Sequence, residues 1–78
     1  MKISVRLYGT LRRFSQTGTP GLWVGELPSQ STVLELIYLL GSKPAEVANA
    51  VINGEVCPLD TEIPASAEVI LVTHMGAG

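Results

Sequence analysis

The chain has 78 residues, of which 46% are hydrophobic and 15% charged, and its formal net charge is −2. This composition is typical of one small folded domain and argues against a disordered segment. Five Lys and Arg residues in all do not indicate nucleic-acid binding, and a single cysteine allows neither an internal disulfide nor a cysteine-based metal site.

The chain opens with an alternating pattern that predicts a strand. Over residues 2–8, isoleucine, valine and leucine are each followed by a polar, basic or aromatic residue, and this period of two is typical of a half-buried strand. Gly9 ends the alternation, and residues 15–21 have the small and polar composition of a loop. Residues 22–27 resume strand character until Pro28. We therefore predict an antiparallel hairpin with a long connection.

One helix is predicted in the middle of the chain. Ser31 or Thr32 is a favourable N-cap, and Glu35 stands three residues after Thr32, which is the spacing of a capping box. Gly41 is placed to end the helix, and Pro44 prevents its resumption. The apolar positions recur at i, i+3, i+4 and i+7 and so share one face: Val33, Leu36, Ile37 and Leu40.

A second, shorter hairpin follows the helix. Residues 50–52 and 55–57 are short strand candidates on either side of Asn53-Gly54, the dipeptide that best tolerates the positive φ of a tight turn. Residues 58–64 contain two prolines and cannot pair as a central strand, because proline lacks the amide donor. We expect this segment to cover one end of the core.

Residues 68–73 are predicted to form the last strand. The continuous apolar run from Val69 to Val72 predicts a strand that is covered on both faces and central in the sheet. One helix with one apolar face then covers one sheet, so the fold class is α+β in two layers. A central last strand is expected to pair parallel with the first strand, through a connection that contains the helix.

Small residues predominate in the last five residues of the sequence, 74–78. We expect residues 1–73 to form the domain and 74–78 a flexible tail, because glycine loses the most conformational freedom when it is held. Side chains this small can enter a narrow channel, which suggests that the terminal carboxyl group is a reagent. The alternative is an ordinary disordered end. His74 has no Cys, His or acid at ligand spacing and is interpreted as a solvated residue.

The order of these elements resembles the ThiS/MoaD sulfur-carrier family, whose fold is the ubiquitin-like β-grasp. The resemblance covers essentially the whole chain and implies a mixed four- to five-stranded sheet packed on one main helix. It is carried by the order and spacing of four stretches: Val5-Arg6-Leu7-Tyr8-Gly9-Thr10-Leu11-Arg12, Thr32-Val33-Leu34-Glu35-Leu36, Val51-Ile52-Asn53-Gly54-Glu55, and Asp60-Thr61 followed by Ala67-Glu68-Val69.

The family resemblance implies a carrier and not an enzyme. A ubiquitin-activating-type partner would adenylate the carboxylate of Gly78, with Gly76 and Ala77 entering the active site of the partner, and sulfur would then give a thiocarboxylate. A biosynthetic enzyme, of the molybdopterin-synthase large-subunit or thiazole-synthase type, would accept that sulfur. ATP and magnesium would belong to the activating partner, and this chain would bind no cofactor and no metal, since its glycines do not have the spacing of a phosphate-binding loop.

The sequence departs from the family pattern at two places. Family members end in Gly-Gly, whereas Ala77 precedes Gly78 here, and Ser66-Ala67 replaces the usual Gly-Asp before the last strand. Two alternatives to the carrier therefore stay open. One is a ubiquitin-like protein modifier that is conjugated through Gly78, and the other is a β-grasp binding subunit that is not activated.

Four further side chains are candidates for a partner surface, and the alternative for each apolar one is a structural role: Tyr8, Arg12, Leu34 and Tyr38. Cys57 follows an apolar residue and precedes Pro58. We therefore interpret it as a small buried hydrophobic residue, and the alternative is a nucleophile. The chain shows no signal peptide and no apolar run long enough to cross a membrane. We therefore expect a cytoplasmic protein that contacts neither nucleic acid nor membrane.

Overall fold

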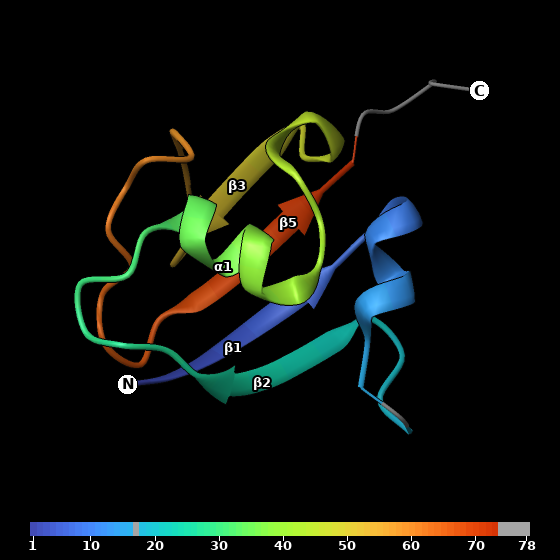
Figure 1. Cartoon of the computed structure of the whole chain (residues 1–78), viewed down its shortest axis with the longest axis horizontal. Coiled ribbons are helices and arrows are strands. Elements are labelled where there is room, and N and C mark those ends of the chain that lie inside the picture. The colour runs from blue at the N-terminus through green and yellow to red at the C-terminus, as the bar shows by residue number, and fades with distance from the viewer. Residues whose placement is uncertain (17, 74–78) are drawn as a thin grey trace.

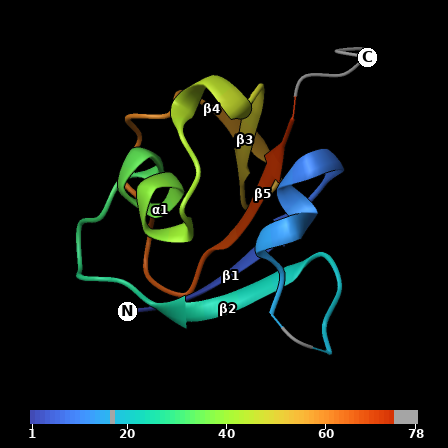
Figure 2. The same ribbon diagram turned by 45° about the vertical axis from the view of Figure 1, so that its right-hand side comes forward.

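A computed structural model describes residues 1–16 and 18–73 and arranges them in two layers, a sheet and a helix that crosses one of its faces (Figure 1). The view turned by 45° shows the helix standing clear of the sheet on that side (Figure 2). Within the described residues, no helix is both long and apolar enough to cross a bilayer. In chain order, the elements are β1 Lys2–Leu7, the 3-10 helix η1 Gly9–Phe14, β2 Leu22–Glu26, α1 Val33–Leu40, the 3-10 helix η2 Pro44–Glu46, β3 Asn49–Ile52, β4 Glu55–Cys57 and β5 Glu68–Val72.

The sheet has five strands in the order β2-β1-β5-β3-β4. The first and last strands, β1 and β5, pair in parallel, whereas β1–β2, β3–β5 and β3–β4 are antiparallel. A parallel pair needs a crossover connection, and here that connection contains α1. The predicted α+β class, the first hairpin and the central parallel strand are confirmed.

The helix α1 begins and ends where its capping residues predict. The backbone N–H of Glu35 donates to Thr32 Oγ1 at 3.3 Å, and the N–H of Thr32 donates to the Glu35 carboxylate at 2.9 Å, which completes the capping box. At the other end, Gly41 adopts φ 98°, a left-handed conformation that costs glycine little. Leu40 is only half-buried, whereas the other three predicted core positions are buried.

The segment before β5 fastens one end of the core, as predicted. Two of its carbonyls, those of Leu59 and Thr61, accept from amides of the first turn of α1, which have no partner inside the helix. Ile63 is buried, and its N–H donates to the carbonyl of Ser31 at 2.8 Å. At Ser66, where the resembled family carries glycine, φ is 60°, so the turn keeps the geometry that favours glycine.

One prediction about β5 is wrong. The strand is central, but its residues alternate between buried and half-buried: Val69 and Leu71 face α1, and Ile70 and Val72 remain partly exposed. The opposite face of the sheet therefore has no helix over it within the described residues. A continuous apolar run indicates apolar side chains on both faces, and it does not show that both faces are covered.

Candidate functional site

The residues predicted to carry the chemistry, Gly76, Ala77 and Gly78, lie outside the described residues, and so does His74. The structure instead describes the point from which they continue, Val72 and Thr73 at the end of β5. We call these two residues the exit point.

The end of β5, at and just before the exit point, is held from both sides by backbone hydrogen bonds. The N–H of Ala48 donates to the carbonyl of Val72 at 2.7 Å, and the N–H of Tyr8 donates to the carbonyl of Leu71 at 3.1 Å. Thr73 is itself buried. The last described residue therefore directly follows a strand that is bonded to both of its neighbours, so its position is set by the body of the domain.

A glycine packs directly against the exit point. Gly9 has φ 63°, and a Cβ added to it would lie 2.1 Å from Thr73 Oγ1 and 3.2 Å from Thr73 Cβ. No side chain fits at that distance, so only glycine allows the backbone at the start of η1 to approach Thr73 this closely. The glycine that ends the first alternating pattern thus has a tertiary role as well as a local one.

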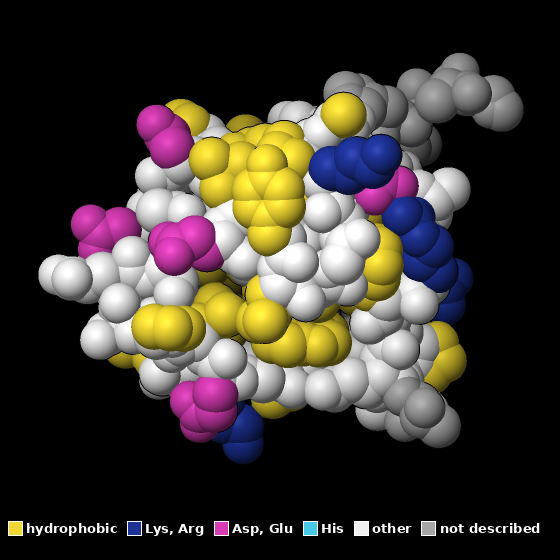
Figure 3. Space-filling model, viewed as in Figure 1, with side chains coloured by type: hydrophobic (Ala, Val, Ile, Leu, Met, Phe, Trp, Pro, Cys, Tyr) yellow, Lys and Arg dark blue, Asp and Glu magenta, His cyan; other side chains and the backbone are white. Residues whose placement is uncertain are grey.

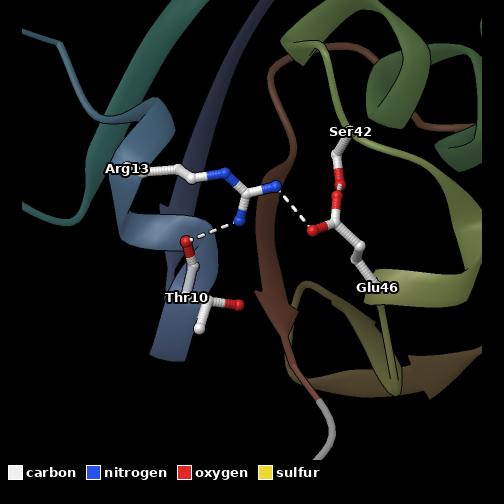
Figure 4. Close-up of polar contacts among 4 residues, drawn as sticks. All are labelled: Thr10, Arg13, Ser42 and Glu46. Carbon is white, nitrogen blue, oxygen red and sulfur yellow. Dashed lines mark hydrogen bonds and ion pairs between the residues drawn. The ribbon is translucent and has the colours of Figure 1, made fainter.

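An ion pair links the two short helices beside the exit point (Figure 4). The guanidinium of Arg13 in η1 donates to the Glu46 carboxylate in η2 at 2.5 Å and also to the carbonyl of Thr10 at 2.9 Å. The other oxygen of Glu46 accepts from the Ser42 hydroxyl at 2.5 Å. Figure 4 shows β5 running between the two sides of this bridge. The bridge therefore joins segments on either side of the strand.

Both contacts act on the acidity of Glu46. The hydrogen bond from Ser42 lowers the pKa of this carboxyl below its ordinary value of 4.5, and the hydrogen bond and charge of Arg13 lower the pKa further. Both stabilise the ionised form in the folded state. The bridge should therefore stabilise the fold above the ordinary carboxyl pKa and lose that effect as the pH falls through the lower, folded-state value.

We expect Glu46→Gln to remove part of the acid sensitivity of the protein. The wild-type chain should be more stable than the variant at neutral pH, and the difference should shrink as the pH falls through the lowered pKa of Glu46, because the carboxyl is then protonated. Urea unfolding followed by circular dichroism at several pH values measures this. Glu62→Gln, which removes an exposed acid with no ion pair among the described residues, is the control. An equal difference between wild type and Glu46→Gln at every pH would contradict the expectation.

The face of the sheet away from α1 carries a row of side chains that crosses all five strands. Pairing places Leu22 beside Arg6, Arg6 beside Ile70, Ile70 beside Val51, and Val51 beside Val56. We call these five residues the outer row. Its apolar members are half-buried, except for Val56, which is 71% exposed. An apolar strip of this kind on an uncovered sheet face is typical of a protein-binding surface.

Two of the predicted partner-surface residues meet at one end of this face. Tyr8, which is 49% exposed, and Arg12 line a hollow of about 170 Å³ together with Arg6, Leu7, Pro20 and Gly21. Tyr8 also bonds to β5 through its backbone, so the hollow lies at the same end of the sheet as the exit point. Tyr8 and Arg12 are thus brought together near the place where the tail begins.

The other two predicted residues lie in the opposite layer. Leu34 is half-buried on α1, and Tyr38 is 62% exposed there beside the exposed Leu39. Figure 3, which views the α1 side, shows hydrophobic side chains gathered on this face and most of the visible Lys and Arg side chains toward its right. The four predicted residues therefore do not form one surface. The sequence analysis did not predict that Arg6 and the rest of the outer row form a surface. The apolar run in β5 was the available signal, because every second residue of that run lies on the outer face.

Neither Cys57 nor any group of metal-ligating side chains forms a further candidate site in the part of the chain that the structure describes. The Cys57 thiol is half-buried, packs against the core and lies 3.7 Å from the carbonyl of Ala50. Among these residues, no three His, Cys, Asp or Glu side chains come together as a metal site would require.

The sheet order and the single packed helix define a ubiquitin-like β-grasp protein. A family model, that of the ThiS family, matches residues 5–78, so the chain belongs to the ThiS family. Members of this family are generally carriers and not enzymes, and they work with an activating enzyme and a sulfur acceptor. Membership thus supports a role as a sulfur carrier or a ubiquitin-like modifier.

The fold is also similar to that of a solved structure, the crystal structure of SAMP1 from Haloferax volcanii. The two chains superpose with a TM-score of 0.70 at 20% sequence identity, and the match covers 100% of each chain. At this identity the likeness bears on the fold. No curated protein matches the chain.

Proposed function

We propose that the protein is a sulfur carrier whose reactive group is the carboxylate of Gly78. A partner enzyme supplies ATP with magnesium and catalyses attack of a carboxylate oxygen on the α-phosphorus, which releases pyrophosphate and leaves an acyl-adenylate. A persulfide then attacks the acyl carbon, and AMP leaves. A thiolate cleaves the resulting acyl disulfide, so a disulfide forms on the donor side and the thiocarboxylate remains on Gly78.

The observation that carries this proposal is the position of Thr73. It follows the central strand directly, the last two carbonyls of that strand accept hydrogen bonds from both sides, and the last three of the five residues after it in the sequence are Gly76, Ala77 and Gly78. Five residues span at most about 17 Å when fully extended, so the carboxylate has reach enough to enter a partner while the domain stays outside. The match to the ThiS family model extends over these residues as well.

The outer row supports the same proposal as a docking surface. Four of its five residues are apolar, it has no helix over it within the described residues, and it lies on the face that ends at Tyr8 beside the exit point. We propose that the activating enzyme, and afterwards the sulfur acceptor, rest on this row while the tail enters their active sites. The receiving pathway is proposed to be cofactor biosynthesis of the molybdopterin or thiamine type, and the location cytoplasmic.

The experiment that tests the function combines the protein with the adenylating enzyme from the same organism, ATP and a sulfur donor, and weighs the intact chain. We expect an adenylate, and then a gain equal to the mass difference between sulfur and oxygen. Deletion of Gly78 should abolish both products, because the chain would then end in Ala77. An unchanged wild-type mass under all conditions would contradict the carrier role.

Two further measurements distinguish the carrier from the two alternatives. A protein modifier would form higher-mass conjugates in a lysate that disappear when Gly78 is deleted, whereas a carrier would form only the thiocarboxylate. Ala77→Gly restores the usual family ending and tests the non-activated subunit. A large gain of product with this variant would show that Ala77 limits activation, and equal yields would support activation of the natural sequence.

A further inference from the structure

The hollow beside Tyr8 is lined by two arginine residues. Arg6 contributes from the outer row and Arg12 from η1, and Tyr8 lines the hollow with them. Within the described residues, neither Arg6 nor Arg12 donates a side-chain hydrogen bond or forms an ion pair, whereas the adjacent Arg13 does both. Two like charges on one hollow without an acid favour an anionic ligand.

The opposite wall of the hollow is held in place by the loop before β2. The side-chain amide of Gln16 donates to the carbonyl of Val24 at 2.6 Å and accepts from its N–H at 3.2 Å, so it occupies the edge of β2 as a neighbouring strand would. The N–H of Gly21 donates to Ser15 Oγ at 2.7 Å, and its carbonyl accepts from Leu7 at 2.8 Å. The hollow is therefore formed before any ligand arrives.

Gly21 places Arg12 at the wall of the hollow. The φ of Gly21 is 77°, which favours glycine, and a Cβ added there would be in ordinary van der Waals contact with Arg12 Nε at 3.7 Å. The guanidinium of Arg12 therefore lies close to the backbone of Gly21. A planar guanidinium with its fork of N–H donors matches a carboxylate in two parallel hydrogen bonds, which a point charge such as lysine does not do.

We propose that this hollow receives the carboxylate of an acidic side chain on the activating partner, held between Arg6 and Arg12. The inference rests on the proposed function, because it takes its ligand from the protein that covers the outer row and accepts the tail. The charge distribution favours it: four of the five Lys and Arg residues lie within the first thirteen residues, whereas six of the seven acids lie at or after Glu35. An acidic partner would align the exit point with its own active site.

The first experiment measures the KM and kcat of the adenylating enzyme for variants of this chain, through pyrophosphate release. Arg6→Gln and Arg12→Gln should each raise the KM about tenfold, since a hydrogen-bonded charge pair is lost, and leave kcat unchanged. Lys2→Gln is the matched control, because it removes the same charge from the same strand about 13 Å away. Arg12→Lys should fall between wild type and Arg12→Gln, and added salt should reduce the difference.

A double variant Arg6→Gln/Arg12→Gln with the KM of Lys2→Gln would overturn the inference and leave the proposed function standing. The second experiment needs no enzyme: the α-amide of N-acetyl-glutamate, whose only charge is the side-chain carboxylate, is titrated into the labelled protein, with the α-amide of N-acetyl-glutamine as the uncharged control. We expect saturable shifts of the Gly21 amide and the arginine Nε–H signals with the charged probe alone, lost in the double variant. Shifts that persist in the double variant would overturn the site. A wild-type chain that is never adenylated overturns the proposed function, and the titration then decides the anion site alone.

Discussion

Replacing Gly9 with alanine is expected to lower the free energy of unfolding by about 2–4 kcal/mol. Alanine would have to adopt a left-handed backbone conformation, and its Cβ would clash in a packed region. The clash is with Thr73, whose Oγ1 would lie 2.1 Å from the added carbon. Relief requires the Thr73 side chain to rotate or the start of η1 to shift, because the Cβ of Thr73 would also lie only 3.2 Å away. Urea unfolding of the variant measures the loss.

Gly54→Ala separates the two contributions to that loss. Gly54 has φ 87°, and a Cβ there meets nothing within 4 Å, so this variant reports the conformational cost alone, about 1–2 kcal/mol. The excess loss in Gly9→Ala should shrink in a Thr73→Ala background, because the hydroxyl that it meets is gone, and a double-mutant cycle gives this coupling. If Gly9→Ala cost no more than Gly54→Ala, the close packing on Thr73 would not contribute to stability.

Leu71→Ala is expected to destabilise the domain by about 2–5 kcal/mol, since it empties a fully buried site in the central strand. Ile70→Ala, one residue earlier, should cost less than about 1.5 kcal/mol, because that side chain is half-buried on the uncovered face. Thermal and urea unfolding compare the two variants. Similar losses would mean that both faces of β5 are packed equally, against the observed alternation.

The same pair tests the outer row. Ile70→Ala should weaken binding of the activating enzyme and raise its KM, while the variant remains folded, because the central apolar side chain of the proposed docking surface is lost. Val24→Ala, on the same face but outside the outer row, is the control. An unchanged KM for Ile70→Ala would remove the outer row from the proposed interface.

Local interactions explain which features could be predicted from the sequence. The capping box of Thr32 and Glu35, the left-handed Gly41 and the Asn53-Gly54 turn each depend on residues a few positions apart. The period of two in β1 and the apolar helix face likewise report burial through spacing alone. These signals were sufficient for the α+β class, the hairpins and the central last strand. The resemblance of four stretches to the family was in turn sufficient to predict that the chain belongs to the ThiS family.

Features that depend on residues distant in the chain required the tertiary structure. The order of the strands sets the outer row, because Ile70 meets Arg6 and Val51 only when β5 lies between β1 and β3. The same arrangement puts Gly9 against Thr73, places Arg6 with Arg12 on one hollow, and separates Tyr8 from Tyr38 by a whole layer. Apolar and basic side chains can be identified from the sequence. Whether each one is buried or exposed, and which residues it contacts, depends on segments that long-range packing brings beside it.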